Sequence, residues 1–192
     1  MGSLLATTFE TPMPCIEGFI KPKEVLDRVG LKQGQKTADL GCGAGFFILA
    51  AASVVGEKGQ AYAVDIQQSA LSAVEDRAHM EGLENVVRLV WADLETAGST
   101  KLADNFLDLA MLVDVLFQNK KLEEILKEAV RITKPGGEIL IIDWKLKDLP
   151  FGPLPDQRIS EHDVKAMAEE QGLALVDSWD PSPYHFSLVY KK

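Results

Sequence analysis

The feature that most constrains the fold is a run of three alternating glycines that follows a short apolar segment ending in an acid. Asp39 closes the apolar segment, and a helix-forming run begins at Phe46. The glycines between them are Gly41, Gly43 and Gly45. Glycine permits positive φ angles and close approach of a ligand to the backbone, and the N–H groups at a helix start favour an anionic group. The segment therefore predicts a buried strand, a tight turn and a helix that together bind a nucleotide-like cofactor at the carboxyl end of a parallel sheet.

Strand-like and helix-like patterns alternate over roughly the first 142 residues. Short apolar runs predict strands at 36–40, 59–65, 86–91, 108–113 and 138–142. Apolar stripes at helical spacing predict helices that begin near Pro22, at Phe46, before Leu71 and near Leu122. The last of these helices is expected to end at Lys134-Pro135-Gly136-Gly137. This alternation predicts a doubly wound parallel sheet with helices on both faces.

The C-terminal part departs from this alternation. A loop rich in proline and glycine is expected over 143–159, followed by a helix in which Ser160 and Asp163 have the form of an N-terminal capping box. Strands are expected over 173–179 and 184–190. The connection between them is too short for a parallel crossover, so they are expected to form an antiparallel pair at one edge of the sheet.

Three acids lie at the ends of successive expected strands, and the carboxyl ends of parallel strands share one rim. Asp65 is placed to accept both hydroxyls of a ribose. Asp93 is placed for an adenine amino group, with backbone groups of Ala92 and Leu94 beside it. Asp39 is placed to receive a cationic amino group, directly or through water. Together they describe a ligand with an adenine, a ribose and an amino-acid head.

Each of these positions also has a purely structural interpretation. The glycines could serve only a tight turn, Asp65 could cap a helix, and Asp93 could be an ordinary acid of a surface loop. Cys42, within the glycine turn, is expected to be a small buried residue.

The motifs and their order resemble those of the class I S-adenosylmethionine-dependent methyltransferases. The pattern D-x-G-x-G-x-G resembles the first motif of that family and differs from the G-x-G-x-x-G of dinucleotide-binding folds. The further segments that resemble family motifs are 64–66, 91–94, 108–116 and 134–137. Within the family, the chain looks most similar to the small-molecule methyltransferases that resemble ubiquinone and menaquinone biosynthesis enzymes.

This resemblance implies an α/β fold: a Rossmann-like, doubly wound, seven-stranded sheet that is mostly parallel with the last strand antiparallel. It implies transfer of a methyl group from S-adenosyl-L-methionine, with S-adenosyl-L-homocysteine as product, to a small and partly apolar acceptor. The residues it implies for the cofactor are Asp39, Gly41, Cys42, Gly43, Gly45, Asp65, Ile66, Ala92, Asp93, Leu94, Leu112 and Val113. Residues 1–192 are expected to form one domain, with 1–20 as an arm or lid and 143–159 as a loop on the acceptor side.

No residue is forced into a catalytic role by its motif. An acceptor that ionises easily needs no general base, whereas an alcohol or an amide needs one. The candidates for such a base are Asp114, Asp143 and His185, and Asp114 could equally cap a helix. The other histidines, His79 and His162, are expected on the surface, and no metal site is expected because the histidines are not at ligand spacing.

Composition limits the partners and the compartment. The net charge of −9 disfavours a nucleic-acid partner, and no apolar run is long enough to span a membrane. No signal peptide is recognisable, so the cytoplasm is the expected location. A disulfide between Cys15 and Cys42, the only cysteines, is left open, as is the choice between monomer and homodimer.

Three alternatives remain open at this point. A non-catalytic S-adenosylmethionine-binding module or partner subunit would bind the cofactor without turnover. An NAD-dependent oxidoreductase is disfavoured by the glycine spacing and by the antiparallel end of the sheet. Arsenite methylation would recruit Cys15 beside Cys42, although such chemistry usually recruits more cysteines than the two present.

Overall fold

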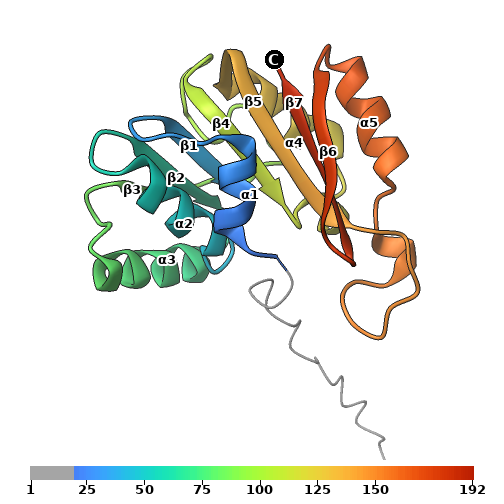
Figure 1. Ribbon diagram of the computed structural model, residues 1–192, viewed down its shortest axis with the longest axis horizontal. Coiled ribbons are helices and arrows are strands. Elements are labelled where there is room, and N and C mark those ends of the chain that lie inside the picture. Colours follow the sequence, from blue (N-terminus) through green and yellow to red (C-terminus); the bar gives the residue numbers. More distant parts are fainter. Residues whose placement is uncertain (1–19) are drawn as a thin grey trace, which may run out of the picture.

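A single seven-stranded sheet, covered by helices on both faces, organises the chain (Figure 1). The computed structural model describes residues 20–192, so the arm expected over 1–20 lies, except for Ile20, outside the described residues. The strands are β1 Lys36–Leu40, β2 Gln60–Asp65, β3 Val87–Trp91, β4 Leu107–Val113, β5 Thr133–Trp144, β6 Ala174–Ser182 and β7 His185–Lys191. The α-helices are α1 Pro22–Val29, α2 Phe46–Val55, α3 Gln68–Glu81, α4 Leu122–Ile132 and α5 Glu161–Glu170.

The strand order is β3-β2-β1-β4-β5-β7-β6. β3, β2, β1, β4 and β5 pair in parallel, and β7 lies antiparallel between β5 and β6. The expected mostly parallel sheet with an antiparallel last strand is therefore confirmed. β1 and β4 are parallel neighbours, although β2 and β3 separate them in the chain. The order of strands therefore reverses between β1 and β4, and a crevice opens at the carboxyl ends of these two strands.

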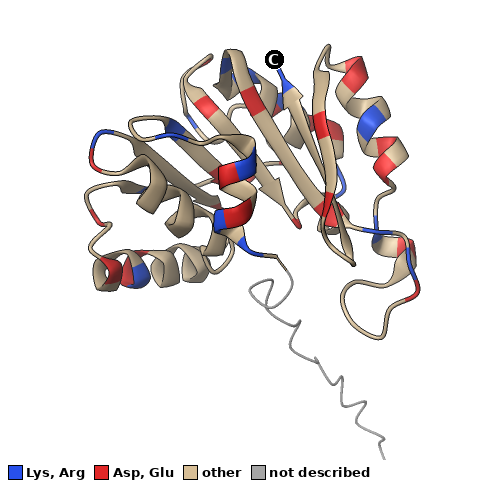
Figure 2. Ribbon diagram, in the orientation of Figure 1, with Lys and Arg blue, Asp and Glu red and all other residues tan. Residues whose placement is uncertain are grey.

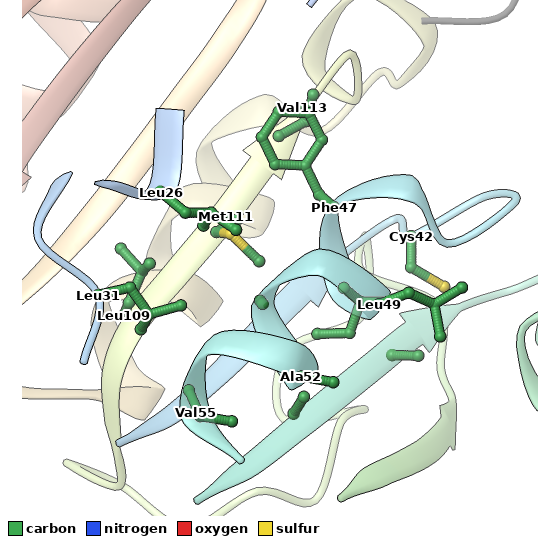
Figure 3. Packing of buried hydrophobic residues seen from close by; sticks show 14 of the residues in the cluster. Leu26, Leu31, Cys42, Phe47, Leu49, Ala52, Val55, Leu109, Met111 and Val113 are labelled. Atoms are coloured by element: carbon green, nitrogen blue, oxygen red, sulfur yellow. The ribbon is translucent and has the colours of Figure 1, made fainter. Parts of the chain in front are cut away.

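Alternate residues of the central strands feed two separate cores. In β4, Leu109, Met111 and Val113 pack towards α1, α2 and α3, whereas Ala110 and Leu112 pack towards α4 and α5. Figure 3 shows Phe47 of α2 beside Val113 of β4. β4 is therefore buried on both faces, as its nearly continuous apolar sequence indicates.

Helix α2 is the inner helix of its face. It carries no charged residue, and Figure 2 shows it uncharged between the charged helices α1 and α3. An apolar surface on all sides suits a helix that is packed against the sheet and against its neighbours. The glycine turn that precedes α2 is thus fixed to the most buried helix of this layer.

Two boundaries differ from the sequence-based expectation at the start of β5. Helix α4 ends at Ile132, before the Lys134-Pro135-Gly136-Gly137 segment, and β5 already begins at Thr133. The ladder with β4 shifts register here, because Leu107 pairs with Thr133 but Leu109 pairs with Glu138. The segment therefore forms an irregular start of the strand, where positive φ is available at Gly136.

The C-terminal hairpin is tighter than expected. β6 extends to Ser182 and β7 begins at His185, so only Pro183 and Tyr184 connect them. All residues from His185 to Tyr190 are buried, because β7 lies inside the sheet and both its faces are covered. The expected antiparallel pair is present, with β6 rather than β7 at the edge.

The loop expected over 143–159 starts later, since β5 continues through Trp144 and includes Asp143. The remaining loop is fastened from inside by Arg158, which is 7% exposed. Its guanidinium donates to the carbonyl of Lys145 at 3.0 Å and to that of Pro153 at 2.6 and 2.8 Å. Gly152 packs onto the Trp144 ring, where an added Cβ would approach ring atoms to 2.8 Å. The loop is therefore held against the end of β5.

We predict that Arg158→Met lowers the free energy of unfolding by ~2 kcal/mol, because the buried carbonyls lose their donor. Limited proteolysis should then cut within 145–159 faster than in the wild type. The matched control is Arg28→Met, which removes a half-exposed ion pair with Asp177 and should change stability little, since exposed pairs contribute little. Equal stability and equal proteolysis of Arg158→Met and the wild type would contradict this role.

Candidate functional site

A cavity of about 510 Å³ opens at the carboxyl ends of β1, β2, β4 and β5. Its walls come from the segments that follow those strands and from the loop after β3. They are Asp39, Gly41, Cys42, Gly43, Ala44, Phe46, Phe47, Asp65, Ile66, Gln67, Ala92, Asp93, Leu94, Val113, Asp114, Val115, Gln118, Asn119 and Trp144.

The three glycines of the turn all have positive φ, but the space around the missing Cβ differs between them. A Cβ at Gly41 would lie 2.6 Å from a methyl of Val115, and one at Gly45 would lie 2.7 Å from a methyl of Val74. At both positions the absent side chain allows close packing within the protein. A Cβ at Gly43 would meet no atom within 4 Å. Since Gly43 lines the cavity, its absent side chain leaves that space open to a ligand.

Asp65 ties the turn to the neighbouring strand. Its carboxylate accepts a hydrogen bond from the backbone N–H of Gly43 at 2.9 Å and another from that of Gln67 at 2.8 Å. The second of these closes an Asx-turn, in which an aspartate side chain accepts from the backbone N–H two residues further on. Asp65 is 8% exposed and lines the cavity, so its remaining acceptor capacity is available there.

Asp39 is a buried acid with an unused oxygen. It is 2% exposed, and its Oδ1 has no hydrogen-bond partner. Burial raises the pKa of the Asp39 carboxyl to about 7, and the Asp65 carboxylate acts in the same direction. Burial also raises the pKa of the Cys42 thiol. Cys42 is a free, buried cysteine, whereas Cys15, the second cysteine of the disulfide and arsenite alternatives, lies outside the described residues.

The wall after β3 is more open. Asp93 is exposed and accepts from the N–H of Glu95 at 2.9 Å and from the hydroxyl of Thr96 at 3.2 Å, which closes a turn. Ala92 and Leu94 on either side are buried. Ile66, 57% exposed, projects from the end of β2. These residues form a partly apolar part of the cavity lining that includes the Asp93 carboxylate.

The three candidate bases lie near the carboxyl ends of β4 and β5, and only Asp114 lines the cavity. Asp114 follows β4 with φ +54°, is 6% exposed and leaves Oδ1 without a partner. Of the two interpretations left open for Asp114, the helix cap is not observed, because Asp143 caps the following helix instead. The Asp143 carboxylate accepts from the N–H groups of Leu116 and Phe117 at 3.1 and 3.3 Å, in the 3₁₀ helix Leu116–Gln118.

Asp143 and His185 are fully buried, and neither lines the cavity. Burial, followed by the Asp114 carboxylate, raises the pKa of Asp143 to about 8. His185 Nε2 lies 3.4 Å from Asp114 Oδ2, and His185 Nδ1 lies 2.8 Å from the hydroxyl of Ser182. The three candidates therefore form one cluster, in which only Asp114 reaches the cavity.

Two residues expected at the cofactor do not line the cavity. Gly45 is turned towards Val74 as the N-cap of α2, and Leu112 faces the α4 side because it alternates with Val113. Sequence reasoning missed Ala44, Phe46, Phe47, Gln67, Val115, Gln118 and Asn119, whereas Trp144 belongs to the segment 143–159 expected on the acceptor side. A usable signal existed for Gln118 and Asn119, two adjacent amides shortly after an apolar strand.

Over residues 20–192, no group of three or more His, Cys, Asp or Glu side chains is arranged to hold a metal ion. Within the same range, no helix has the length and apolar character needed to cross a bilayer. His79 and His162 are exposed, as expected.

Comparison with known proteins links this chain to one family. A family described as a methyltransferase domain matches residues 31–182. A ubiquinone/menaquinone biosynthesis C-methyltransferase of Azotobacter vinelandii is 30% identical over 115 residues, which are 60% of this chain and 44% of that protein. Demethylmenaquinone methyltransferase of Geobacillus stearothermophilus is 31% identical over 115 residues, 60% of this chain and 47% of that protein. The matched part thus spans less than half the length of either relative.

Among solved structures, a SAM-dependent methyltransferase from Aquifex aeolicus superposes with a TM-score of 0.83 and 29% identity, covering 92% of both chains. A 4+2 cyclase has the same fold at a TM-score of 0.76 and 18% identity, covering 89% of this chain and 80% of its own. The fold alone therefore does not determine the reaction.

The family match covers most of the chain and leaves the oxidoreductase alternative without support. The chain belongs to the class I S-adenosylmethionine-dependent methyltransferases, in the neighbourhood of those of ubiquinone and menaquinone biosynthesis.

Proposed function

We propose that this chain transfers a methyl group from S-adenosylmethionine to a small, partly apolar acceptor, and that residues 20–192 act as one domain. The observation that carries the proposal is the single cavity wall on which the Gly43 opening, the Asp65 carboxylate and the unpaired Asp39 oxygen meet. The names of the relatives from Azotobacter vinelandii and Geobacillus stearothermophilus make a quinol ring the first acceptor class to test.

The residues on this wall fit the cofactor in kind. Asp65 offers acceptors to the ribose hydroxyls, and the open space at Gly43 admits the amino-acid part close to the backbone. Asp39 Oδ1, buried and unpaired, suits a cationic amino group. Ile66 and the segment 92–94 offer a flat surface and a carboxylate to the adenine. When bound, S-adenosylmethionine supplies an activated methyl group.

The chain itself has to orient the acceptor and exclude water. Apolar side chains of Phe47, Val113 and Val115 line the middle of the cavity, and Trp144 lines its acceptor end. The loop fastened by Arg158 supports Trp144 from behind, since Arg158 lies over the Trp144 ring and Gly152 packs on it. A partly apolar acceptor that carries a few polar groups suits such a wall.

The proposal is tested by incubating the full chain with methyl-labelled S-adenosylmethionine and a panel of acceptors that includes 1,4-naphthoquinol and a short-tailed benzoquinol. We expect labelled product, one methyl group heavier by mass spectrometry, from at least one quinol. Binding of the cofactor without label transfer to any acceptor would instead favour the non-catalytic S-adenosylmethionine-binding module.

We predict that Gly43→Ala weakens S-adenosylmethionine binding at least tenfold, because the added methyl fills the space left for the ligand. Gly82→Ala is a matched control, since Gly82 also has positive φ and no atom within 4 Å of an added Cβ, but it caps the far end of α3. Both variants should lose ~1 kcal/mol of stability through left-handed strain. Equal cofactor affinity of the two variants, measured by calorimetry, would contradict the proposal that the cofactor occupies the open space at Gly43.

We predict that Asp39→Asn stabilises the ligand-free protein above about pH 4, with a difference that grows until about pH 7 and then levels off. The pKa of Asp39 is raised in the folded state from 3.8 to about 7, so the folded state resists ionisation and the wild type loses stability across this window. At ~1.4 kcal/mol for each unit of pKa, the plateau amounts to a few kcal/mol.

Urea unfolding at several pH values measures this difference. Asp76→Asn, an exposed change on α3, controls for the altered net charge. The same Asp39→Asn variant should bind S-adenosylmethionine more weakly at pH 8. A stability difference that does not vary with pH would show that Asp39 is not a destabilised buried acid.

A further inference from the structure

Buried polar atoms that the fold leaves unpaired lie at and behind the cavity wall formed by Asp114 and Trp144. Asp114 Oδ1, His185 Nε2 and Trp144 Nε1 all lack a hydrogen-bond partner. Asp114 and Trp144 line the cavity, and the Trp144 and His185 ring centroids are 4.2 Å apart. Unpaired buried polar groups are costly, so the two that belong to residues lining the cavity, Asp114 Oδ1 and Trp144 Nε1, point to a ligand that supplies the missing partners.

Hydrogen bonding determines which nitrogen of His185 carries the proton. The Ser182 hydroxyl oxygen accepts from the N–H groups of Tyr184 and His185 at 3.1 and 3.2 Å. Its own hydrogen is therefore directed to His185 Nδ1, 2.8 Å away. Nδ1 is then the acceptor of the neutral ring, and the proton lies on Nε2, which faces Asp114 Oδ2 at 3.4 Å.

The three candidate bases differ in their hydrogen-bond partners and in whether they line the cavity. Asp143 uses both oxygens for backbone N–H groups, those of Leu116 and Phe117 at one oxygen and its own following N–H of Trp144 at the other. His185 is 0% exposed and does not line the cavity. Asp114 alone both lines the cavity and keeps an oxygen free.

The backbone of Asp114 is held in place on both sides. Its N–H donates to the carbonyl of Ile142 at 2.9 Å, and its carbonyl accepts from the side chain of Gln118 at 2.8 Å. Its left-handed φ of +54° is uncommon for a residue other than glycine and is the kind of local strain that accumulates at functional sites. The backbone that carries the Asp114 side chain at the cavity wall is therefore fixed.

We propose that Asp114 and His185 form a pair that recognises a hydroxyl group on the aromatic ring of the acceptor and takes up its proton. Asp114 is the catalytic residue: Oδ1 accepts the hydrogen bond from the hydroxyl. His185 is a positioning residue, which holds the carboxylate through Nε2–H once the contact closes. This inference rests on the proposed function and adds to it the chemical group by which the acceptor is recognised.

The step balances without a further reactant. The acceptor O–H bond breaks, its proton forms a bond to Asp114 Oδ1, and its electron pair stays on the acceptor, whose ring becomes the nucleophile. A ring carbon bonds to the methyl group while the methyl–sulfur bond of S-adenosylmethionine breaks, and S-adenosylhomocysteine leaves with that electron pair. The methylated carbon then loses its hydrogen as a proton and the oxygen regains one, so the ring is aromatic again and the charge of the acceptor is unchanged. The proton on Asp114 passes to water after the product leaves. A hydroxyl group suits this cluster because it donates to a carboxylate and accepts from an N–H such as that of Trp144.

The deciding experiment is a calorimetric titration of the full-length protein, saturated with S-adenosylhomocysteine, under oxygen-free conditions. The probes are 1,4-naphthoquinol and 1,4-dimethoxynaphthalene, which share the ring but differ in the hydroxyl hydrogens. We expect the quinol to bind the wild type at least tenfold more tightly than the diether. Asp114→Asn should abolish most of this preference while S-adenosylhomocysteine binding stays within about threefold.

A matched pair of variants tests His185 as a positioning residue. His185→Gln keeps an N–H donor near the position of Nε2, whereas His185→Leu removes it. With naphthoquinol as acceptor, we expect Asp114→Asn to lower kcat by about 10²–10⁴-fold. His185→Leu should lower kcat substantially, and His185→Gln should restore it to within a few-fold of the wild type. A purely structural histidine would show no such rescue, and thermal unfolding of each variant checks its folding.

The outcomes distinguish failure of the Asp114–His185 pair from failure of the proposed function. Equal binding of quinol and diether to the wild type, no binding of either probe to the S-adenosylhomocysteine complex, or unchanged turnover in Asp114→Asn overturns the hydroxyl-recognising pair and leaves the cofactor site intact. Failure of the wild type to bind S-adenosylhomocysteine at all overturns the proposed function itself.

Discussion

The site depends on the hydrogen bond from the Gly43 N–H to the Asp65 carboxylate. Through it one side chain joins the turn after β1 to the end of β2, and the N–H groups of Gly41 and Cys42 reinforce the link by donating to the carbonyl of Val64 at 2.8 and 2.9 Å. These hydrogen bonds fix the turn, with the open side of Gly43 and an acid both lining the cavity. A side chain at Gly43 would fill that opening, so the constraint that shapes the turn also shapes what it can bind.

Buried acids are the second common element, and they are poorly explained by folding alone. Asp39 and Asp114 are almost fully buried, and each keeps an unpaired oxygen, which destabilises the folded state. For Asp143, by contrast, the hydrogen bonds that cap the 3₁₀ helix after Asp114 offset the free-energy cost of burying the carboxyl group. Natural proteins retain destabilising groups where function requires them. In the proposed function, Asp39 is therefore a contact of the cofactor and Asp114 a contact of the acceptor, on the neighbouring strands β1 and β4 of one cavity.

The sequence was sufficient for the fold because its strongest signals are local. Glycine spacing, strand–helix alternation and the short final connection predict the doubly wound sheet with its antiparallel strand, which the structure confirms. What it could not predict depends on tertiary contacts. The burial of both faces of β7 follows from its insertion between β5 and β6. That Asp143 rather than Asp114 caps the 3₁₀ helix follows from the pairing of β4 with β5. The clustering of Asp114 with His185, far apart in the chain, follows from both. Assignment of the cofactor residues remains a prediction, although most of them line one cavity.

The most direct test of the central claim is calorimetric titration of the purified protein at pH 8 with S-adenosylmethionine, with S-adenosylhomocysteine and, for comparison, with NADH. The account predicts saturable binding of the first two at one site per chain, no binding of NADH, and loss of at least tenfold in affinity in Asp65→Ala. Absence of binding by both S-adenosyl compounds to a folded protein, or saturable binding of NADH alone, would contradict it.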